Sequence, residues 1–232
     1  ELIPAYFNWS GGKDSTLALY KVLQQAQFEI RYLLTTFNQE ANRISMHGVR
    51  NELLIAQAAA LNIPSKPVFL PVSSDMSAYE NAMNQAIQEI REEGISDCFF
   101  GDIFLEDLRA YREDKLKEAG ISAHFPLWKR DTRELICEFV NQGFKTVVVC
   151  VDSSKLEDTF AGRVIDVDFI TDLPENVDPC GENGEFHTFV FDGPIFKQPV
   201  SFELGEQVHK TYPAQSAEHP EYRFCFQELI PV

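Results

Sequence analysis

Long hydrophobic runs are missing from this sequence of 232 residues. No apolar stretch approaches the roughly 20 residues that a helix needs to span a bilayer. The first four residues carry neither a basic stretch nor the hydrophobic segment of a secretory signal. We therefore expect a cytoplasmic protein that has no membrane partner.

Paired cysteines are also missing. The five cysteines are Cys98, Cys137, Cys150, Cys180 and Cys225, and no two of them form a C-x-x-C motif. An odd, scattered set argues against a disulfide framework and against a structural zinc site, and favours a reducing compartment. Cys98 and Cys150 lie in apolar runs and are expected to be packing residues.

Basic residues are scarce. The chain has 20 lysines and arginines against 36 aspartates and glutamates, which gives a formal net charge of −16. Nucleic-acid binding normally needs a basic surface that neutralises phosphates. We therefore expect no nucleic-acid partner.

A glycine-rich segment directly follows the apolar run at residues 5–9. Its sequence is Ser10-Gly11-Gly12-Lys13-Asp14-Ser15. The glycines let the backbone approach an anion closely, and the N-terminus of the helix that follows favours negative charge. Lys13 adds a full positive charge and the serines add hydroxyl donors. The segment is therefore typical of a phosphate-binding loop.

This segment is not a Walker A loop, which needs glycine at the position of Phe7 and serine or threonine at that of Asp14. It resembles instead the pyrophosphate loop of the ATP pyrophosphatase superfamily. That resemblance implies cleavage of ATP to AMP and pyrophosphate, with adenylation of a substrate.

Strands and helices are expected to alternate through the first 125 residues. Strands are expected at residues 5–9, 32–36, 67–71 and 96–101, and helices at residues 14–26, 48–61, 76–93 and 106–119. Such alternation predicts a parallel sheet with helices on both faces, and ligands bind beyond the carboxyl ends of its strands. Gly101 and Asp102 are expected at that edge, beside the glycine-rich loop.

The pattern changes after residue 125. A helix is expected at residues 132–142 and strands at 146–151, 186–191 and 200–203, while the polar stretch from about residue 211 is expected to be partly disordered. We therefore predict an ATP-binding domain at residues 1–125 and a smaller α+β domain for substrate binding at residues 126–232.

Three further clusters follow the glycine-rich loop in order, at residues 44–50, 101–113 and 180–188. Together with the loop and with residues 126–128 they resemble the diphthine–ammonia ligase family, over roughly residues 5–195. The resemblance implies a Rossmann-like fold of the adenine nucleotide alpha hydrolase type with a smaller C-terminal domain. It also implies a reaction in which ATP adenylates the carboxylate of diphthine, a modified histidine on a translation elongation factor, and ammonia displaces AMP.

The resemblance and the residue chemistry together give a set of candidate site residues. ATP is expected to contact Ser10, Gly11, Gly12, Lys13, Asp14, Ser15, His47 and Gly101. Mg²⁺ is expected at Asp14 and Asp102, because magnesium prefers carboxylates together with phosphate oxygens. The acceptor and ammonium are expected at Glu106, Arg109, Glu182, Glu185 and His187. The catalytic groups are expected to be Lys13, Asp14, Asp102, Glu185 and His187.

Each cluster has a structural alternative. His47 is equally compatible with a helix-capping or surface residue, and Asp102 with a helix cap. Glu106, Arg109 and Glu113 share one helical face, which a solvated set of ion pairs also explains. The loop at residues 180–188 resembles a plain surface turn as well, since glycine often marks turns.

Two other functions remain open for the whole chain. One is a tRNA-modifying pyrophosphate-loop enzyme, which would be expected to have a basic surface and reactive cysteine pairs. The other is a non-catalytic protein that binds ATP or AMP, for which the polar loop at residues 180–188 would be unnecessary. The sequence leaves open the true acceptor and whether the chain forms a homodimer.

Overall fold

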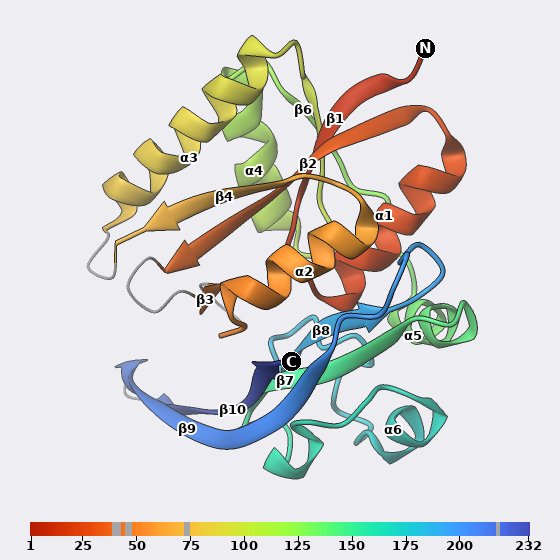
Figure 1. Cartoon of the computed structure of the whole chain (residues 1–232). Coiled ribbons are helices and arrows are strands. Elements are labelled where there is room, and N and C mark those ends of the chain that lie inside the picture. The colour runs from red at the N-terminus through yellow and green to blue at the C-terminus, as the bar shows by residue number, and fades with distance from the viewer. Residues whose placement is uncertain (39–42, 45–47, 72–74, 217–218) are drawn as a thin grey trace.

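The computed structural model describes residues 1–38, 43–44, 48–71, 75–216 and 219–232. Two sheets and the helices around them make up this part of the chain (Figure 1). None of the described helices has the length and apolar character needed to cross a membrane.

The first sheet contains the alternating strands expected from the sequence. Its strands are β1 (Ile3–Asn8), β2 (Phe28–Asn38), β3 (Arg43–Ile44), β4 (Ser65–Leu70), β5 (Asp97–Phe99) and β6 (Ser122–His124). Five of them are parallel in the order β4-β2-β1-β5-β6, and β3 adds a short antiparallel pair to β2. The expected parallel sheet is confirmed, although β6 was not expected.

Helices cover both faces of this sheet. They are α1 (Lys13–Gln25), α2 (Asn51–Leu61), α3 (Met76–Glu92) and α4 (Glu106–Glu118). Side chains alternate across a strand, so Tyr6 of β1 packs with α3 and α4, whereas Ala5 and Phe7 pack with α1 and α2. The period-two alternation of β1 thus divides the apolar interior between the two faces.

The second sheet is antiparallel, in the order β8-β7-β10-β9. Its strands are β7 (Lys145–Asp152), β8 (Phe186–Asp192), β9 (Phe202–Ser216) and β10 (His219–Pro231). The helices α5 (Thr132–Asn141) and α6 (Val167–Asp172) and a short 3₁₀ turn, η1 (Asp158–Phe160), accompany it. The smaller α+β part expected at the C-terminal end is confirmed.

The expectation of disorder from about residue 211 is wrong. Residues 202–216 and 219–231 form a long hairpin, in which Thr211 pairs with Arg223 and Val208 with Phe226. The segment looked polar because most side chains of β9 are exposed, whereas β10 buries Cys225, Gln227 and Leu229 on one face.

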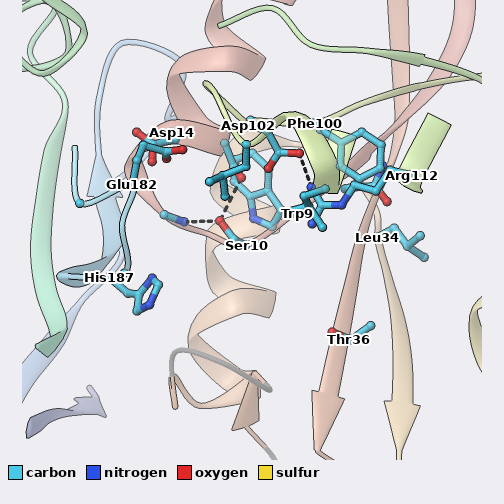
Figure 2. A pocket seen from close by; sticks show the side chains of 18 of the residues that line it. Trp9, Ser10, Asp14, Leu34, Thr36, Phe100, Asp102, Arg112, Glu182 and His187 are labelled. Carbon is cyan, nitrogen blue, oxygen red and sulfur yellow. Dashed lines mark hydrogen bonds and ion pairs between the residues drawn. The ribbon is translucent and has the colours of Figure 1, made fainter. Parts of the chain in front are cut away.

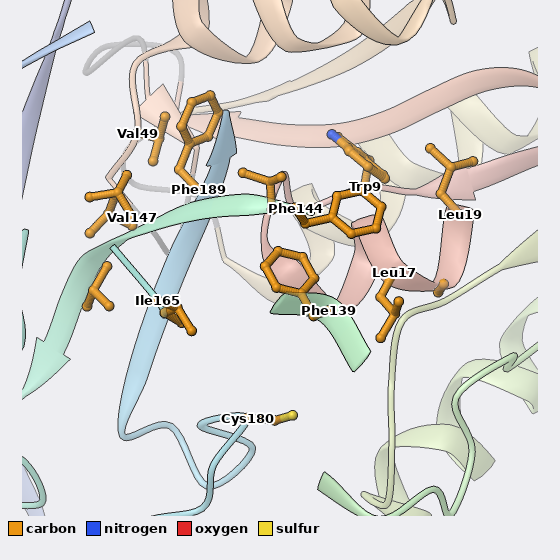
Figure 3. Packing of buried hydrophobic residues seen from close by; sticks show 14 of the residues in the cluster. Trp9, Leu17, Leu19, Val49, Phe139, Phe144, Val147, Ile165, Cys180 and Phe189 are labelled. Atoms are coloured by element: carbon orange, nitrogen blue, oxygen red, sulfur yellow. The ribbon is translucent and has the colours of Figure 1, made fainter. Parts of the chain in front are cut away.

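One apolar cluster joins the two sheets. It runs from Phe7 and Leu17 in the first part to Val147 and Phe189 in the second, through Phe139 and Phe144 (Figure 3). The two parts therefore pack through a shared interior, and the division between residues 125 and 126 stays a prediction.

Candidate active site

A cavity of about 740 Å³ lies at the carboxyl ends of β1, β2 and β5. Residues from the second sheet and from the loop before β8 also line it, among them Tyr222 and Phe224. Glu182 of that loop and His187 of β8 are labelled in Figure 2. The cavity therefore occupies the edge of the parallel sheet where ligands bind in folds of this type.

Most of the candidate residues line this cavity. These are Ser10, Gly12, Lys13, Asp14, Ser15, Gly101, Asp102, Glu182 and His187. Four other described candidates are not among its lining residues, namely Gly11, Glu106, Arg109 and Glu185. His47 lies outside the described residues, so its expected ATP contact stays a prediction.

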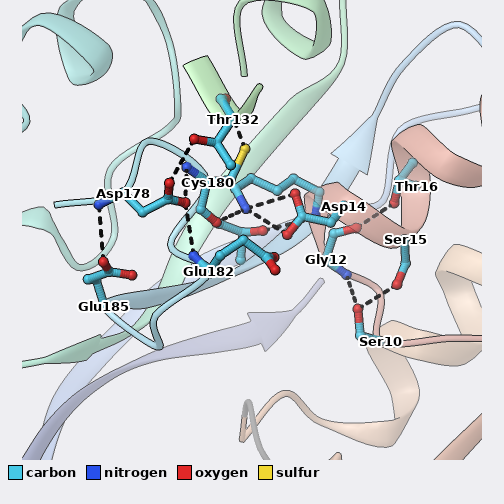
Figure 4. Close-up of polar contacts among 12 residues, drawn as sticks. Ser10, Gly12, Asp14, Ser15, Thr16, Thr132, Asp178, Cys180, Glu182 and Glu185 are labelled. Atoms are coloured by element: carbon cyan, nitrogen blue, oxygen red, sulfur yellow. Dashed lines mark hydrogen bonds and ion pairs between the residues drawn. The ribbon is translucent and has the colours of Figure 1, made fainter. Parts of the chain in front are cut away.

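The glycine-rich loop turns sharply before α1. Gly11 has φ +76°, a left-handed conformation that glycine adopts without strain. The Ser10 hydroxyl accepts from the Gly12 N–H at 3.2 Å and lies 2.9 Å from the Ser15 hydroxyl (Figure 4). The loop therefore holds the start of α1, with its positive dipole end, at the cavity.

Lys13 joins the two halves of the site. Its ammonium group lies 3.0 Å from both carboxylate oxygens of Asp14, donates to the Cys180 carbonyl and lies 5.3 Å from the centroid of the Phe186 ring. Burial opposes its charge, but the neighbouring Asp14, Cys180 and Glu182 outweigh burial and raise the pKa of Lys13. Lys13 is thus a buried, charged lysine that faces the loop at residues 180–188.

Gln57 was not singled out from the sequence, although it supports the glycine-rich loop from behind. Its fully buried amide donates to the Gly11 carbonyl at 3.0 Å and to the Val190 carbonyl at 2.7 Å, and it accepts from the Trp9 indole at 2.9 Å. The apolar residues around it in the helix gave it the appearance of an ordinary helix residue. Its partners lie 46 to 133 positions away, so no local pattern signals this role.

Gly101 lies against the first turn of α1 and not in an open position. A Cβ at Gly101 would lie 2.8 Å from the backbone nitrogen of Ser15. Next to it, Asp102 forms an ion pair with Arg112, whose guanidinium lies 4.6 Å from the centroid of the Phe100 ring. Asp102 therefore reaches the cavity edge as predicted, with its charge already partnered by an arginine.

Glu182 lies beside Asp14 at the wall of the cavity (Figures 2 and 4). Burial and the nearby Asp14 carboxylate raise the pKa of Glu182 to about 8. Two close carboxyl groups repel each other when both are ionised, and a cation bound between them relieves that repulsion. The structure thus brings Glu182, predicted as an acceptor contact, next to a predicted metal ligand.

Glu185 and His187 differ in their surroundings, although they were predicted together. The buried Glu185 carboxylate accepts from the backbone N–H groups of Asp178 and Asn183, each at 3.0 Å, and fixes the loop. His187 lines the cavity, and burial together with the charge of Lys13 lowers its pKa to about 4. His187 is therefore neutral at pH 7, while Glu185 is positioned to support the loop.

The predicted helical face on α4 forms local ion pairs. Glu106 contacts Lys129 at 3.0 Å, and Arg109 contacts Glu113 at 3.1 Å. The Arg109 guanidinium also lies over the rings of Phe125 and Trp128. These contacts favour the structural alternative for this face.

Cys180 is buried and its thiol donates to the Thr132 carbonyl at 3.2 Å. Burial raises the pKa of the Cys180 thiol well above its usual range. A nucleophilic cysteine needs a stabilised thiolate, so this position fits packing and hydrogen bonding.

Two family descriptions match the chain in order. "Diphthamide synthase N-terminal domain" matches residues 5–123, and "Diphthamide synthase C-terminal domain" matches residues 131–214. Together they include the glycine-rich loop, Gly101 and Asp102, and the loop that carries Glu182 and His187.

Curated relatives carry the name diphthine–ammonia ligase. The protein of Mus musculus is 27% identical over 222 residues, which is 86% of this chain and 82% of the relative. Those of Bos taurus and Homo sapiens are 26% and 28% identical over 63% and 50% of this chain. The matched part spans about half the length of these two relatives, 56% and 44% respectively. On the match of both domain descriptions, this chain belongs to the diphthamide synthase family.

Proposed function

We propose that this chain is an ATP-dependent ligase that adenylates a carboxylate of the diphthine type and transfers ammonia to it, releasing AMP and pyrophosphate. The observation that supports this proposal is that the glycine-rich loop and the polar loop before β8 line the same cavity. The phosphate-type loop before α1 faces Glu182 and His187 from the second part of the chain. A ligase must hold activated carboxylate and amine together, because shared binding makes their reaction effectively unimolecular.

The loop and α1 supply the groups for the phosphates of ATP. Lys13, the hydroxyls of Ser10 and Ser15, and the N-terminus of α1 face the cavity. A Cβ at Gly101 would clash with the Ser15 nitrogen at 2.8 Å, and one at Gly12 would crowd the Thr188 carbonyl at 3.2 Å. These groups hold the triphosphate and stabilise the negative charge of the departing pyrophosphate.

The carboxylate pair of Asp14 and Glu182 fits a magnesium ion better than Asp102 does. Asp14 is paired with Lys13 as Asp102 is with Arg112, but only Asp14 has a second carboxyl group, that of Glu182, beside it at the cavity wall. Oxygen ligands of this kind suit Mg²⁺, which when bound to ATP neutralises part of the phosphate charge. We propose Asp14 and Glu182 as its protein ligands, with Asp102 holding Arg112 in place.

His187 is proposed as the base for the amine. After ammonia attacks the adenylate, the nitrogen of the adduct must lose a proton as AMP leaves, and the neutral imidazole of His187 lines the cavity where it can accept that proton. Glu185 holds the loop that precedes His187 and so positions it. We further propose that the acceptor carboxylate is carried by a translation elongation factor, as the family resemblance implies, and that the reaction takes place in the cytoplasm, consistent with five free cysteines.

Product analysis tests the proposed reaction. The protein is incubated with ATP, Mg²⁺ and ammonium, with and without an elongation factor that bears diphthine. We expect AMP and pyrophosphate in equal amounts, formed only when the acceptor is present. Lys13→Ala should lower ATP affinity at least about tenfold, because it removes a buried charge that a bound phosphate would contact. The matched control is Lys66→Ala, whose ammonium pairs with Glu89 outside the cavity. Release of ADP and phosphate would contradict the proposed chemistry.

A further inference from the structure

A thiol, an imidazole and a carboxylate meet on the side of the second sheet that faces away from the cavity. Cys225 of β10 lies directly opposite His209 of β9 in the long hairpin (Figure 1), so the two share a face of the sheet. Neighbouring residues on a strand point to opposite faces, and Phe224 lines the cavity. Cys225 and His209 therefore lie on the other face, where Asp158 of η1 joins them.

The donor atoms of these three residues are close enough to share one ion. The His209 Nε2 lies 2.8 Å from a carboxylate oxygen of Asp158, and one donor atom from each residue lies within 4.8 Å of the other two. Two ligand atoms on a tetrahedral zinc ion lie about 3.3–3.7 Å apart, since the bonds to the metal are about 2.0–2.3 Å long. Small side-chain rotations therefore suffice to bring Asp158, His209 and Cys225 around a metal.

The carboxylate of Asp158 is oriented by a neighbour. The Ser153 hydroxyl donates to the oxygen that does not contact His209. Carboxylates that bind metals are usually held by a hydrogen bond of this kind. The Ser153 N–H donates to the Arg223 carbonyl at 2.9 Å, which joins this turn to β10. The Arg223 guanidinium lies 3.8 Å from the same carboxylate but is more than half exposed, so it can turn toward solvent.

The Cys225 thiol is buried and makes a weak contact. Its sulfur lies 3.7 Å from the side-chain oxygen of Gln207, whose amide nitrogen lies 3.3 Å from the Ala161 carbonyl and from the Gln227 side chain. Thiols are weak hydrogen-bond donors, so a metal–thiolate bond replaces this contact at little cost. The exposed His209 leaves the site open to solvent on its other side.

We propose that Cys225, His209 and Asp158 form a zinc-binding site with water as the fourth ligand. A set of sulfur, nitrogen and oxygen donors suits Zn²⁺, whereas Mg²⁺ and Ca²⁺ prefer oxygen donors alone. On binding, the thiol releases its proton to water, and the resulting thiolate and the carboxylate balance the two charges of the ion. The metal would join η1 to the hairpin whose opposite face lines the cavity, so it would stabilise the second sheet without entering the reaction.

The spacing of these residues along the chain does not reveal the site. The argument against structural zinc rested on the absence of a C-x-x-C motif, and the three ligands at positions 158, 209 and 225 match no local metal motif. Cys225 and His209 come together only because β9 pairs with β10.

Titrations of the full chain with Co²⁺ and Zn²⁺, after metal is removed with EDTA, test the site. Cobalt bound to a thiolate has a sulfur-to-metal charge-transfer band in the near ultraviolet, which a site with oxygen donors alone lacks. We expect this band to saturate at a single Co²⁺ per chain, to disappear when Zn²⁺ is added and to persist in excess Mg²⁺. Zn²⁺ should also raise the urea midpoint, because it binds the folded state. Absence of the band, including metal binding without it, would overturn the proposal.

Substitutions locate the metal. Cys225→Ser should abolish the cobalt band, and both Cys225→Ser and His209→Asn should weaken Zn²⁺ binding at least about tenfold. His209 is exposed, so His209→Asn should keep the urea midpoint of the metal-free protein and tests the site even where Cys225→Ser fails to fold. One control is His124→Asn, because His124 lies 2.8 Å from Asp97 but no third such ligand joins this pair among the described residues. Another is Cys137→Ser, which removes a partly exposed thiol. Unchanged Zn²⁺ affinity in His209→Asn, or an equal loss in the controls, would overturn the proposal.

Discussion

The backbone nitrogen of Ser15 lies 2.8 Å from where a Cβ on Gly101 would stand. The end of β5 therefore touches the first turn of α1 backbone to backbone. The glycine at this position sets how closely the phosphate helix approaches the sheet. Gly101 thus acts through the position of α1, in addition to lining the cavity.

Gly101→Ala should displace the start of α1. The backbone cannot yield as a flexible side chain would, so we expect a loss of about 1–3 kcal/mol in stability and at least about tenfold weaker ATP binding. Urea unfolding and calorimetry measure the two effects. The control is Gly94→Ala, where no atom lies within 4 Å of the Cβ position but φ is +81°. It should cost about 1–2 kcal/mol of stability and leave ATP affinity unchanged.

Gln57→Leu should loosen the glycine-rich loop. The change leaves the Trp9 indole and the Gly11 and Val190 carbonyls without their buried partner. At about 1–3 kcal/mol for an unsatisfied buried group, we expect a total loss of roughly 2–5 kcal/mol, measured by urea unfolding, and weaker ATP binding. The exposed Gln88, which contacts Glu92 on α3, offers the control Gln88→Leu. An unchanged midpoint in Gln57→Leu would show that the loop does not depend on this amide.

The glycine-rich loop was predictable from sequence, whereas its supports were not. A strand, two glycines and an amphipathic helix are local features, and they predict a turn around the start of a helix, where Ser10, Lys13 and Ser15 lie in the structure. Gln57 is recognisable only from partners far along the chain. The same holds for Asp102, whose pairing with Arg112 depends on where α4 packs.

The second part of the chain was less predictable for a related reason. Glu185 and His187 were both expected to contact the acceptor, but β8 begins only at Phe186. Glu185 belongs to the preceding turn, so its carboxylate bonds to backbone N–H groups there. The long hairpin was missed because polar residues interrupt the apolar residues in both of its strands. Without knowing that the two strands pair, the segment reads as polar and irregular.

Glu185→Gln and His187→Gln should distinguish a residue that stabilises the loop from one that takes part in the reaction. Glu185→Gln replaces a carboxylate that accepts from two backbone N–H groups, so we expect a stability loss of about 1–3 kcal/mol and reduced turnover. His187→Gln should retain stability at pH 8 and lose acceptor-dependent AMP formation by about 10²–10⁴-fold, the usual contribution of a general base. Both should bind ATP normally. Full activity in His187→Gln would remove it from the reaction.

Cys180→Ser should have little effect on turnover. The thiol is 2% exposed and its raised pKa leaves almost no thiolate near pH 7. We expect turnover within about threefold of the wild type, since a hydroxyl can still donate to the Thr132 carbonyl. In the native protein, iodoacetamide should modify the partly exposed Cys137 before Cys180, as mapped by mass spectrometry. Rapid alkylation of Cys180 with loss of turnover would instead indicate a reactive thiol.

Acid should destabilise the fold partly through His187. The imidazole takes up a proton at its ordinary pKa of 6.5 in the unfolded chain, but only at about 4 in the folded protein. Between these values the unfolded chain binds more protons, so the free energy of unfolding falls as the pH falls from 6.5 to 4. The full shift corresponds to about 3–4 kcal/mol.

Protonation of carboxylates that are paired in the folded protein also lowers the free energy of unfolding in this pH range. The contribution of His187 is therefore isolated by comparing the wild type with His187→Gln. Urea unfolding at intervals from pH 8 to pH 4 gives the free energy of unfolding of each. We expect the two curves to run parallel above pH 7 and to converge or cross below it, because the variant has no imidazole to protonate. Parallel curves down to pH 4 would mean that His187 titrates alike in both states. The imidazole would then be exposed to water, and its assignment as a neutral base next to Lys13 would fail.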